Sequence, residues 1–165
     1  MAAVTSSGSA KLTFPSDTQI HVERVFAAPK HLVYRAVTEP DLVRRWWNAK
    51  RGEVTVAEID LRVGGRWRYA MKTPDGMEVA FHGTFREIVP NEHVVQTEVF
   101  EMPGLTDDDA TVNTMDLVEH DGSTTMTVLI QCTNAEQREA IVASGMEAGL
   151  QDAYDLLEEV ATSLA

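Results

Sequence analysis

Alternating hydrophobic and polar residues predict a series of strands along most of the chain. Successive side chains of a strand point to opposite faces of a sheet, so a period of two indicates a strand with one buried face. Short segments rich in Gly, Pro, Asn and Asp separate these stretches and are typical of turns. We expect strands over residues 18–26, 53–59, 66–72, 78–86, 93–101, 111–119 and 124–132.

The sequence Pro74-Asp75-Gly76 predicts a tight turn between two of these strands, because proline presets the backbone and glycine adopts positive φ without strain. A hairpin centred on Asp75 keeps the hydrophobic residues of both strands on one face, as a stable register requires. The predicted pairs are Met71 with Val79, Tyr69 with Phe81 and Trp67 with Gly83 on that face, and Lys72 with Glu78 and Arg68 with His82 on the other.

A second hairpin is expected where residues 120–123 (HDGS) connect the last two strands. Its predicted register pairs Leu117 with Met126 and Met115 with Val128. In the strand before this hairpin, residues 93–101, we expect Val95, Thr97 and Val99 to face inward.

Three helices complete the pattern. Residues 29–38 predict a short helix, and a second begins at Pro40 and ends near Trp46-Trp47. Residues 135–163 predict one long amphipathic helix, which begins after Asn134. The expected fold class is α+β, a curved antiparallel sheet around a long C-terminal helix, with two short helices after the first strand. The apolar arc of the long helix comprises Val142, Met146, Gly149, Leu150, Ala153, Leu156, Leu157, Val160 and Leu164.

Composition narrows the classes of protein. The 165 residues are expected to form one domain over 18–165, preceded by a flexible leader, residues 1–17. A net charge of −12 disfavours nucleic acid and anionic membranes as partners. Cys132 is the single cysteine, which excludes an intramolecular disulfide and favours the cytoplasm. No apolar run reaches the length of a membrane span, and neither a metal site nor a cofactor motif is present.

The order of these landmarks resembles the START-like helix-grip (SRPBCC) superfamily, and within it the family named for homologues of the activator of the heat-shock-protein-90 ATPase. The resemblance implies a helix-grip fold with a cavity between sheet and helix, and a small-molecule carrier or sensor, or a co-chaperone-like role. It implies no catalytic residue. The matching segments are RVFAAP at 24–29, WW at 46–47, DLRVGG at 60–65, PDG at 74–76, GTFREIVP at 83–90 and GMEAGL at 145–150.

Aromatic and methionine residues predict an adaptable apolar lining for such a cavity. Gly149 and Ala153 leave space beneath the long helix, either for a ligand or for a bulky residue of the sheet such as Trp67. The candidate ligand-binding residues are Trp46, Trp67, Tyr69, Met71, Phe81, Phe85, Thr97, Val99, Met115, Met126, Met146, Gly149 and Ala153.

Three functions remain open at this point. We expect non-catalytic binding of a hydrophobic or amphipathic small molecule. A co-chaperone that stimulates a heat-shock-protein ATPase is the first alternative, and it could use the outward face that carries Arg66, Arg68, His82 and Arg86 to meet an acidic protein partner. A cyclase-like or hydrolase-like enzyme that uses the same cavity is the second, and it rests on analogy of fold alone.

Overall fold

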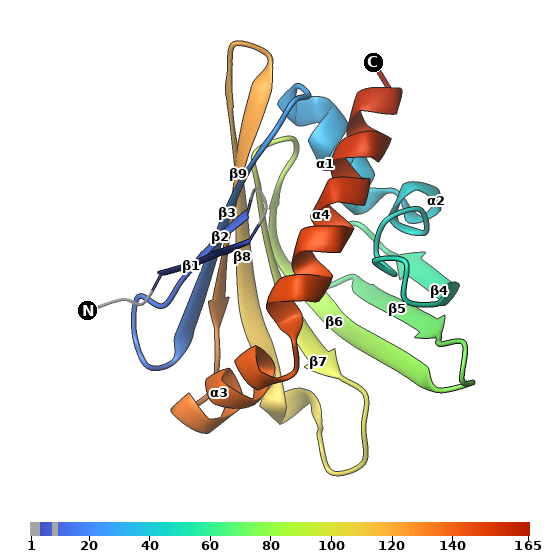
Figure 1. Ribbon diagram of the computed structural model, residues 1–165, viewed down its shortest axis with the longest axis vertical. Coiled ribbons are helices and arrows are strands. Elements are labelled where there is room, and N and C mark those ends of the chain that lie inside the picture. Colours follow the sequence, from blue (N-terminus) through green and yellow to red (C-terminus); the bar gives the residue numbers. More distant parts are fainter. Residues whose placement is uncertain (1–3, 8–9) are drawn as a thin grey trace.

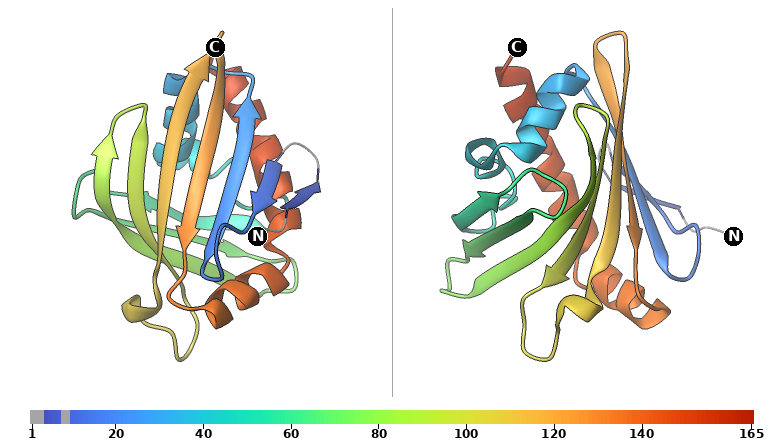
Figure 2. Two further views of the ribbon diagram at one scale, coloured as in Figure 1. Left: turned by 90° about the vertical axis from the view of Figure 1, so that its left-hand side faces the viewer. Right: turned by 180° about the vertical axis from the view of Figure 1, so that it is seen from behind.

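Nine strands form one antiparallel sheet that curves around helix α4, as the computed structural model shows for the described residues, 4–7 and 10–165 (Figures 1 and 2). The spatial order of the strands is β1-β2-β3-β9-β8-β7-β6-β5-β4. The expected α+β class and curved antiparallel sheet are therefore confirmed. The strands are β1 (Val4–Ser7), β2 (Ala10–Thr13), β3 (Gln19–Phe26), β4 (Glu53–Ile59), β5 (Arg66–Lys72), β6 (Glu78–Val89), β7 (His93–Phe100), β8 (Thr111–His120) and β9 (Ser123–Gln131).

The N-terminal segment belongs partly to the sheet. Strand β2 pairs with β3, and β1 pairs with β2, both antiparallel. Ala10 and Leu12 are fully buried, so β2 contributes apolar side chains to the core. The flexible leader expected over residues 1–17 thus includes two strands, at residues 4–7 and 10–13, and its part over residues 1–3 and 8–9 lies outside the described residues.

Both predicted hairpin registers are confirmed. Met71 lies opposite Val79, Tyr69 opposite Phe81 and Trp67 opposite Gly83. In the second hairpin, Leu117 lies opposite Met126. Gly76 has φ +88°, so the turn uses the left-handed conformation that glycine tolerates best. Local turn chemistry was therefore sufficient to set these two registers.

The predicted orientation of strand β7 is wrong. Thr97 accepts a hydrogen bond on its Oγ1 from the backbone N–H of Thr84 at 2.9 Å, on the side of the sheet where Thr84 pairs with Arg66. Val95, Thr97 and Val99 therefore face away from α4, and the residues that face it are Val94, Gln96, Glu98 and Phe100. Val95, Thr97 and Val99 are nonetheless buried, so an apolar set exists on each side of β7.

The predicted long helix is two helices, α3 (Ala135–Ala143) and α4 (Met146–Ser163). The chain breaks at Gly145, whose φ of 85° lies in the left-handed region. The break turns α3 away from the axis of α4, and Val142 is consequently exposed although the predicted apolar arc placed it inside. None of the described helices is long and apolar enough to cross a membrane.

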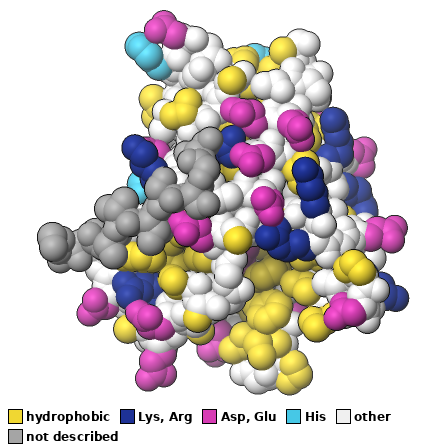
Figure 3. All heavy atoms as spheres, viewed as in Figure 1, with side chains coloured by type: hydrophobic (Ala, Val, Ile, Leu, Met, Phe, Trp, Pro, Cys, Tyr) yellow, Lys and Arg dark blue, Asp and Glu magenta, His cyan; other side chains and the backbone are white. Residues whose placement is uncertain are grey.

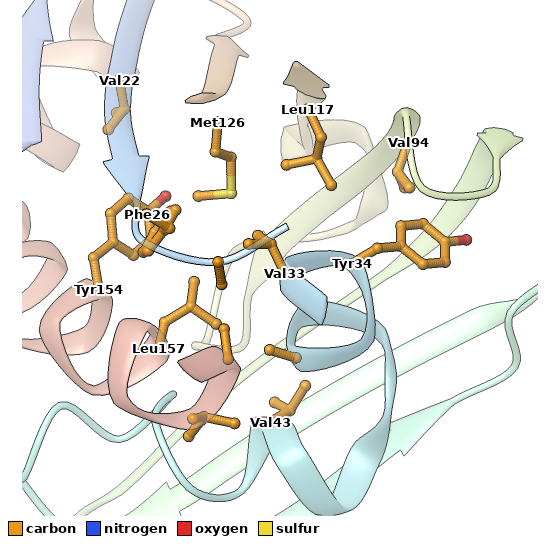
Figure 4. Packing of buried hydrophobic residues seen from close by; sticks show 14 of the residues in the cluster. Val22, Phe26, Val33, Tyr34, Val43, Val94, Leu117, Met126, Tyr154 and Leu157 are labelled. Carbon is orange, nitrogen blue, oxygen red and sulfur yellow. The ribbon is translucent and has the colours of Figure 1, made fainter. Parts of the chain in front are cut away.

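The hydrophobic core lies between the sheet and the C-terminal half of α4. Helices α1 (Lys30–Thr38) and α2 (Pro40–Val43) pack beside that half. The core residues come from α1, α2, α4 and strands β2 to β9, and Figure 4 shows part of this cluster. Phe26 meets Tyr154 edge to face, with ring centroids 5.8 Å apart. The two short helices after β3 are confirmed, but α2 ends at Val43 and not near Trp46-Trp47 as predicted, because the chain continues there as turns.

Polar contacts at its edges fix α4 to the sheet. Arg24 of β3 is buried and binds Asp155 (Nη1 to Oδ1, 2.8 Å) and Glu158 (Nη2 to Oε1, 3.3 Å). Gln151 accepts a hydrogen bond from the backbone N–H of Ala10 and donates one to its carbonyl oxygen, at 3.1 and 3.0 Å. The helix is thus held across the sheet without requiring close packing along its whole length.

Candidate functional site

The inner face of the sheet, defined as the side that lies toward α4, carries a continuous aromatic wall. The wall consists of Trp47, Trp67, Tyr69, Phe81 and Phe100. Tyr69 lies at its centre, with ring centroids 4.8 Å from Trp67 and 5.6 Å from Trp47. Phe81 links Trp47 at 5.9 Å to Phe100 at 5.1 Å. Offset and edge-to-face contacts of this kind fix the orientation of each ring.

Gly83 makes the room that the Trp67 ring occupies. Trp67 is buried and donates from Nε1 to the carbonyl oxygen of Thr97 at 3.1 Å. A Cβ atom at Gly83 would lie 2.7 Å from that Nε1 and would overlap the Thr97 carbonyl group. The space for the bulky Trp67 therefore comes from the opposite strand and not from Gly149.

The two adjacent tryptophans have different environments. Trp46 donates from Nε1 to the carbonyl oxygen of Ala36 at 2.8 Å and so joins the turn after α2 to α1. Trp47 contacts Tyr69 and Phe81 on the inner face. Trp47, which was not among the predicted ligand-binding residues, therefore belongs to the aromatic wall, whereas the predicted residue Trp46 does not.

The N-terminal half of α4 lies over a part of the inner face that is only partly buried. A Cβ atom at Gly149 would meet no heavy atom within 4 Å outside its own stretch of helix. Met146 and Leu150 of α4 are half-buried, as is Met115 of β8. Figure 3 shows hydrophobic side chains gathered in the lower half of this view, next to the N-terminal end of α4. The loop after Phe100 adds the exposed side chains of Met102 and Leu105.

Glu98 introduces a carboxylate into this apolar surrounding. Its Oε1 accepts a hydrogen bond from Asn113 Nδ2 at 3.3 Å, and Asn113 in turn accepts one from the Thr111 hydroxyl at 2.9 Å. Glu98 is half-buried, yet it lies deep in the concave face, where protein atoms replace much of its water. This desolvation raises the pKa of Glu98, although the Asn113 hydrogen bond opposes the shift.

Two tyrosine hydroxyl groups share this region with Glu98. Burial, assisted by the negative charge of Glu98, raises the pKa of Tyr69. The same two causes raise the pKa of Tyr154, against a smaller opposing effect of Arg24. Both hydroxyls therefore stay protonated, and neither has a hydrogen-bond partner among the described residues. The inner face thus combines a desolvated carboxyl group with two available hydroxyl groups.

Two hollows lie on the outer face of the sheet, opposite to the predicted cavity. The larger, of about 550 Å³, is lined by Glu58, Arg66, Trp67, Arg68, His82 and Glu101. The smaller, of about 150 Å³, adjoins it along Arg66 and His82 and includes Thr97, Val99 and Arg86. Thr97 and Val99 therefore belong to the outer face, and their predicted place in the inner lining is wrong.

Acidic partners neutralise half of the predicted basic face. Arg68 binds Glu101 through two hydrogen bonds of 2.9 Å, and the ring of His82 contacts Glu101 at 2.9 Å and Asp107 at 2.7 Å. The Arg68 guanidinium is the main cause that lowers the pKa of Glu101 to about 2, and the hydrogen bond to Asp107 is the main cause that raises the pKa of His82. Arg66 and Arg86 are exposed, and neither forms an ion pair with the described residues.

The remaining candidates divide between core and inner face. Phe85, Met126 and Ala153 are buried in the packed interior, whereas Met71, Phe81, Met115 and Met146 are half-buried on the side toward α4. The role of all these residues in ligand binding stays a prediction.

Comparison with known proteins agrees with this architecture. A model of the family described as "Activator of Hsp90 ATPase homolog 1-like protein" matches residues 27–162. The chain belongs to this family. This match, together with the helix-grip fold of the structure, confirms the resemblance inferred from the sequence. No curated protein matches the chain.

Several solved structures of this family's fold align with nearly the whole chain. A crystal structure of a protein from Rhodobacter sphaeroides has a TM-score of 0.84 and 23% identity, and covers 94% of this chain and 99% of its own. A protein from Mycobacterium smegmatis gives 0.81 and 24%, with 96% of each chain covered. One from Arthrobacter aurescens, solved by NMR, gives 0.81 and 22%, with 98% and 91% covered. At these identities, the likeness establishes the fold alone.

Four residues of the candidate site were not identified from the sequence: Glu98, Asn113, Tyr154 and Trp47. Glu98 lies on a strand whose apolar neighbours suggested the opposite orientation. Asn113 shares its side of β8 with Met115 and Leu117, whose pairing was predicted. The signal that could have found Glu98 is the pair of hydrophobic residues Val94 and Phe100, which share its side of β7.

Two further features of this family member concern metals and thiols. Within residues 4–7 and 10–165, no group of three or more His, Cys, Asp or Glu side chains is placed to hold a metal ion. Cys132 is buried, and this burial raises the pKa of its thiol.

Proposed function

We propose that this protein binds an amphipathic small molecule between α4 and the inner face of the sheet, as a carrier or sensor. The observation that carries this proposal is the placement of Glu98 and the Tyr69 hydroxyl, both short of hydrogen-bond partners, within a half-buried aromatic and methionine-rich surface. Small-molecule sites have this composition, a largely apolar lining with a few polar groups that orient the ligand.

The energetic argument concerns the part of α4 that lacks a packed partner. The C-terminal half of α4 contributes buried residues such as Leu157 and Val160, whereas Met146 and Leu150 of its first turns stay half-buried. A ligand that covered them would gain about 0.8 kcal/mol for each buried CH₂ group. The polar contacts of Arg24 and Gln151 hold α4 in place while this surface remains free.

The substitution Gly149→Leu tests this proposal, because its side chain would extend into the open space beneath α4. We expect the variant to bind the neutral dye Nile red at least about tenfold more weakly, since the leucine covers apolar surface that the dye needs. Its melting temperature should stay level or rise, because glycine costs about 1 kcal/mol in a helix interior. Dye fluorescence titrations and thermal unfolding measure the two quantities.

Ala148→Leu is the matched control, since Ala148 is the exposed neighbour on the same helix. It adds the same side chain and the same hydrophobicity on the solvent side, and its dye affinity should equal that of the wild-type protein. Equal dye affinity in all three proteins, or no saturable binding by the wild-type protein, would contradict the proposal.

A co-chaperone role is the second candidate, and Arg66 and Arg86 favour it. Both are exposed on the outer face without an ion-pair partner among the described residues, so they are available to an acidic protein surface. The activity in the family's description suggests what to measure, namely stimulation of an Hsp90 ATPase. Stimulation that is abolished by Arg66→Glu with Arg86→Glu, at unchanged dye binding, would place this candidate first.

An enzyme that acts on the bound molecule is the third candidate. It would draw its acid or base from Glu98, with Tyr69 beside it. For the place of action we propose the cytoplasm, since the only cysteine of the chain, Cys132, is a free thiol that suits a reducing compartment.

A further inference from the structure

We propose that the molecule bound on the inner face is a lipophilic amine, whose ammonium group pairs with Glu98 while its apolar part lies against the aromatic wall. This inference rests on the proposed function and adds the chemical class of the ligand. Its starting point is that Glu98 is an acidic, half-buried side chain on the inner face without a counter-ion among the described residues.

Glu98 has unused hydrogen-bonding capacity. An ionised carboxylate offers about four lone-pair positions, and the side chain of Glu98 receives one hydrogen bond, from Asn113. No cation of the described residues pairs with it. Burial raises the pKa of Glu98, and the hydrogen bond from Asn113 opposes that shift. A desolvated carboxylate without a partner is unfavourable, and a ligand cation would remove that cost.

Arg24 is a charge on the same face that has its counter-ions in place. It is also buried, and it has two carboxylate partners, Asp155 and Glu158, both on α4. These two carboxylates neutralise the charge of Arg24, although its Nε is buried without a hydrogen-bond partner in the described part of the chain. Of these two inner-face charges, Glu98 is the one that lacks a partner among the described residues, and that partner has to be positive.

The neighbours of Glu98 suit an ammonium group as well. Tyr69 and Tyr154 remain neutral because burial raises their pKa, so their hydroxyl oxygens can accept hydrogen bonds from N–H groups. Trp47 and Phe81, the half-buried members of the aromatic wall, have π systems of the kind that attract cations. A fatty acid or another anion would instead meet Glu98 as a like charge, in a protein with a net charge of −12.

Three probes with the same eight-carbon chain separate the head-group chemistry from apolar binding. Octylamine, 1-octanol and octanoate compete with Nile red at pH 8, where the amine is protonated. We expect octylamine to displace the dye at a concentration at least about tenfold lower than 1-octanol, because a charge-assisted hydrogen bond is added to the same apolar contact. Octanoate should be the weakest competitor.

The substitution Glu98→Gln keeps the shape of the side chain and removes its charge. It should abolish the preference for octylamine over 1-octanol and leave the affinity for 1-octanol unchanged. Glu53→Gln is the control, since it removes the same charge from an exposed position of β4. The control variant should retain the full preference for the amine.

The inference and the proposed function fail in different ways. Equal displacement by octylamine and 1-octanol, or an amine preference that survives in Glu98→Gln, would overturn the amine inference. Dye binding that is sensitive to Gly149→Leu would in that case still support an apolar ligand. Absence of any saturable dye binding would overturn both.

Discussion

Replacing Gly83 with alanine is expected to lower the free energy of unfolding by about 3 kcal/mol or more, the upper end of the usual cost of overpacking an interior. The added Cβ would overlap the backbone carbonyl group of Thr97 and lie 2.7 Å from Trp67 Nε1. Backbone atoms in the middle of a sheet cannot move away as the end of a flexible side chain can. The hydrogen bond from Trp67 to Thr97 would be lost together with the packing of the ring. Urea denaturation, followed by tryptophan fluorescence, measures the effect.

Gly149→Ala is the matched control for this substitution. It adds the same Cβ atom in a helix, where it would meet no neighbouring atom within 4 Å. Because alanine is favoured over glycine in helices by about 1 kcal/mol, this variant should be slightly more stable than the wild-type protein. If Gly83→Ala proved as stable as Gly149→Ala, the proposed packing of Trp67 over Gly83 would be wrong.

Removing both carboxylates that bind Arg24 is expected to have the second large effect. The double substitution Asp155→Asn with Glu158→Gln should destabilise the protein by about 3 kcal/mol, because it leaves a buried guanidinium without a counter-ion. The side chain of Arg24 is only 3% exposed, so water cannot replace its lost partners. Both substitutions preserve shape, and the amide oxygen introduced at position 158 could still accept the hydrogen bond that the backbone N–H of Ala27 now donates to Glu158. Urea denaturation at neutral pH measures this loss.

The sign of this effect distinguishes the buried ion pair from a general effect of charge. In a protein with a net charge of −12, neutralising two carboxylates should reduce repulsion and be neutral or slightly stabilising. We expect that outcome for the control Glu53→Gln with Glu159→Gln, which changes two exposed residues. Adding Arg24→Met to the destabilised double variant should restore most of the stability, since an apolar side chain of similar volume needs no counter-ion. No loss of stability in the Asp155 and Glu158 double variant would show that Arg24 does not depend on these partners.

The hairpins illustrate how much of the fold was predictable from local sequence. The segment Pro74-Asp75-Gly76 determined a turn, and the alternation on each side of it then allowed one register with all hydrophobic residues on one face. The same reasoning gave the pairing of Leu117 with Met126. In both hairpins, the paired residues are close in sequence, so turn chemistry and periodicity contained the necessary information.

Strand β7 shows where local pattern was insufficient. Both of its faces carry buried residues, Val95 and Val99 on the outer one and Val94 on the inner one. An alternating pattern identifies the buried face only when the other face is polar and solvated, and here the loop 101–110 and the long side chains of the outer face cover that side. The inward position of Glu98, and with it the polar part of the candidate site, could therefore not be read from the sequence.

The long amphipathic helix shows a second such limit. Helical periodicity continues across Ser144 and Gly145, and a glycine inside a helix costs only about 1 kcal/mol, so the pattern predicted one helix. In the folded chain, Gly145 adopts a φ of 85° and α3 and α4 have different directions. The start of α4 is therefore marked by the left-handed conformation of Gly145, which helical periodicity does not reveal.

By itself, the sequence determined the class of fold, the strands and helices with few exceptions, two hairpin registers, and the family to which the chain belongs. The strands, helices and registers follow from interactions between residues near one another in the chain, where periodicity and turn chemistry act directly. The family was indicated by a resemblance in the order of short motifs along the chain. Only the tertiary structure decided which polar groups meet. Arg24 and Asp155 are separated by 131 positions, and Glu98 comes near Tyr69 and Tyr154 because three separate elements converge. The physical reason is that such contacts depend on the curvature of the sheet and the position of α4, which no local segment specifies.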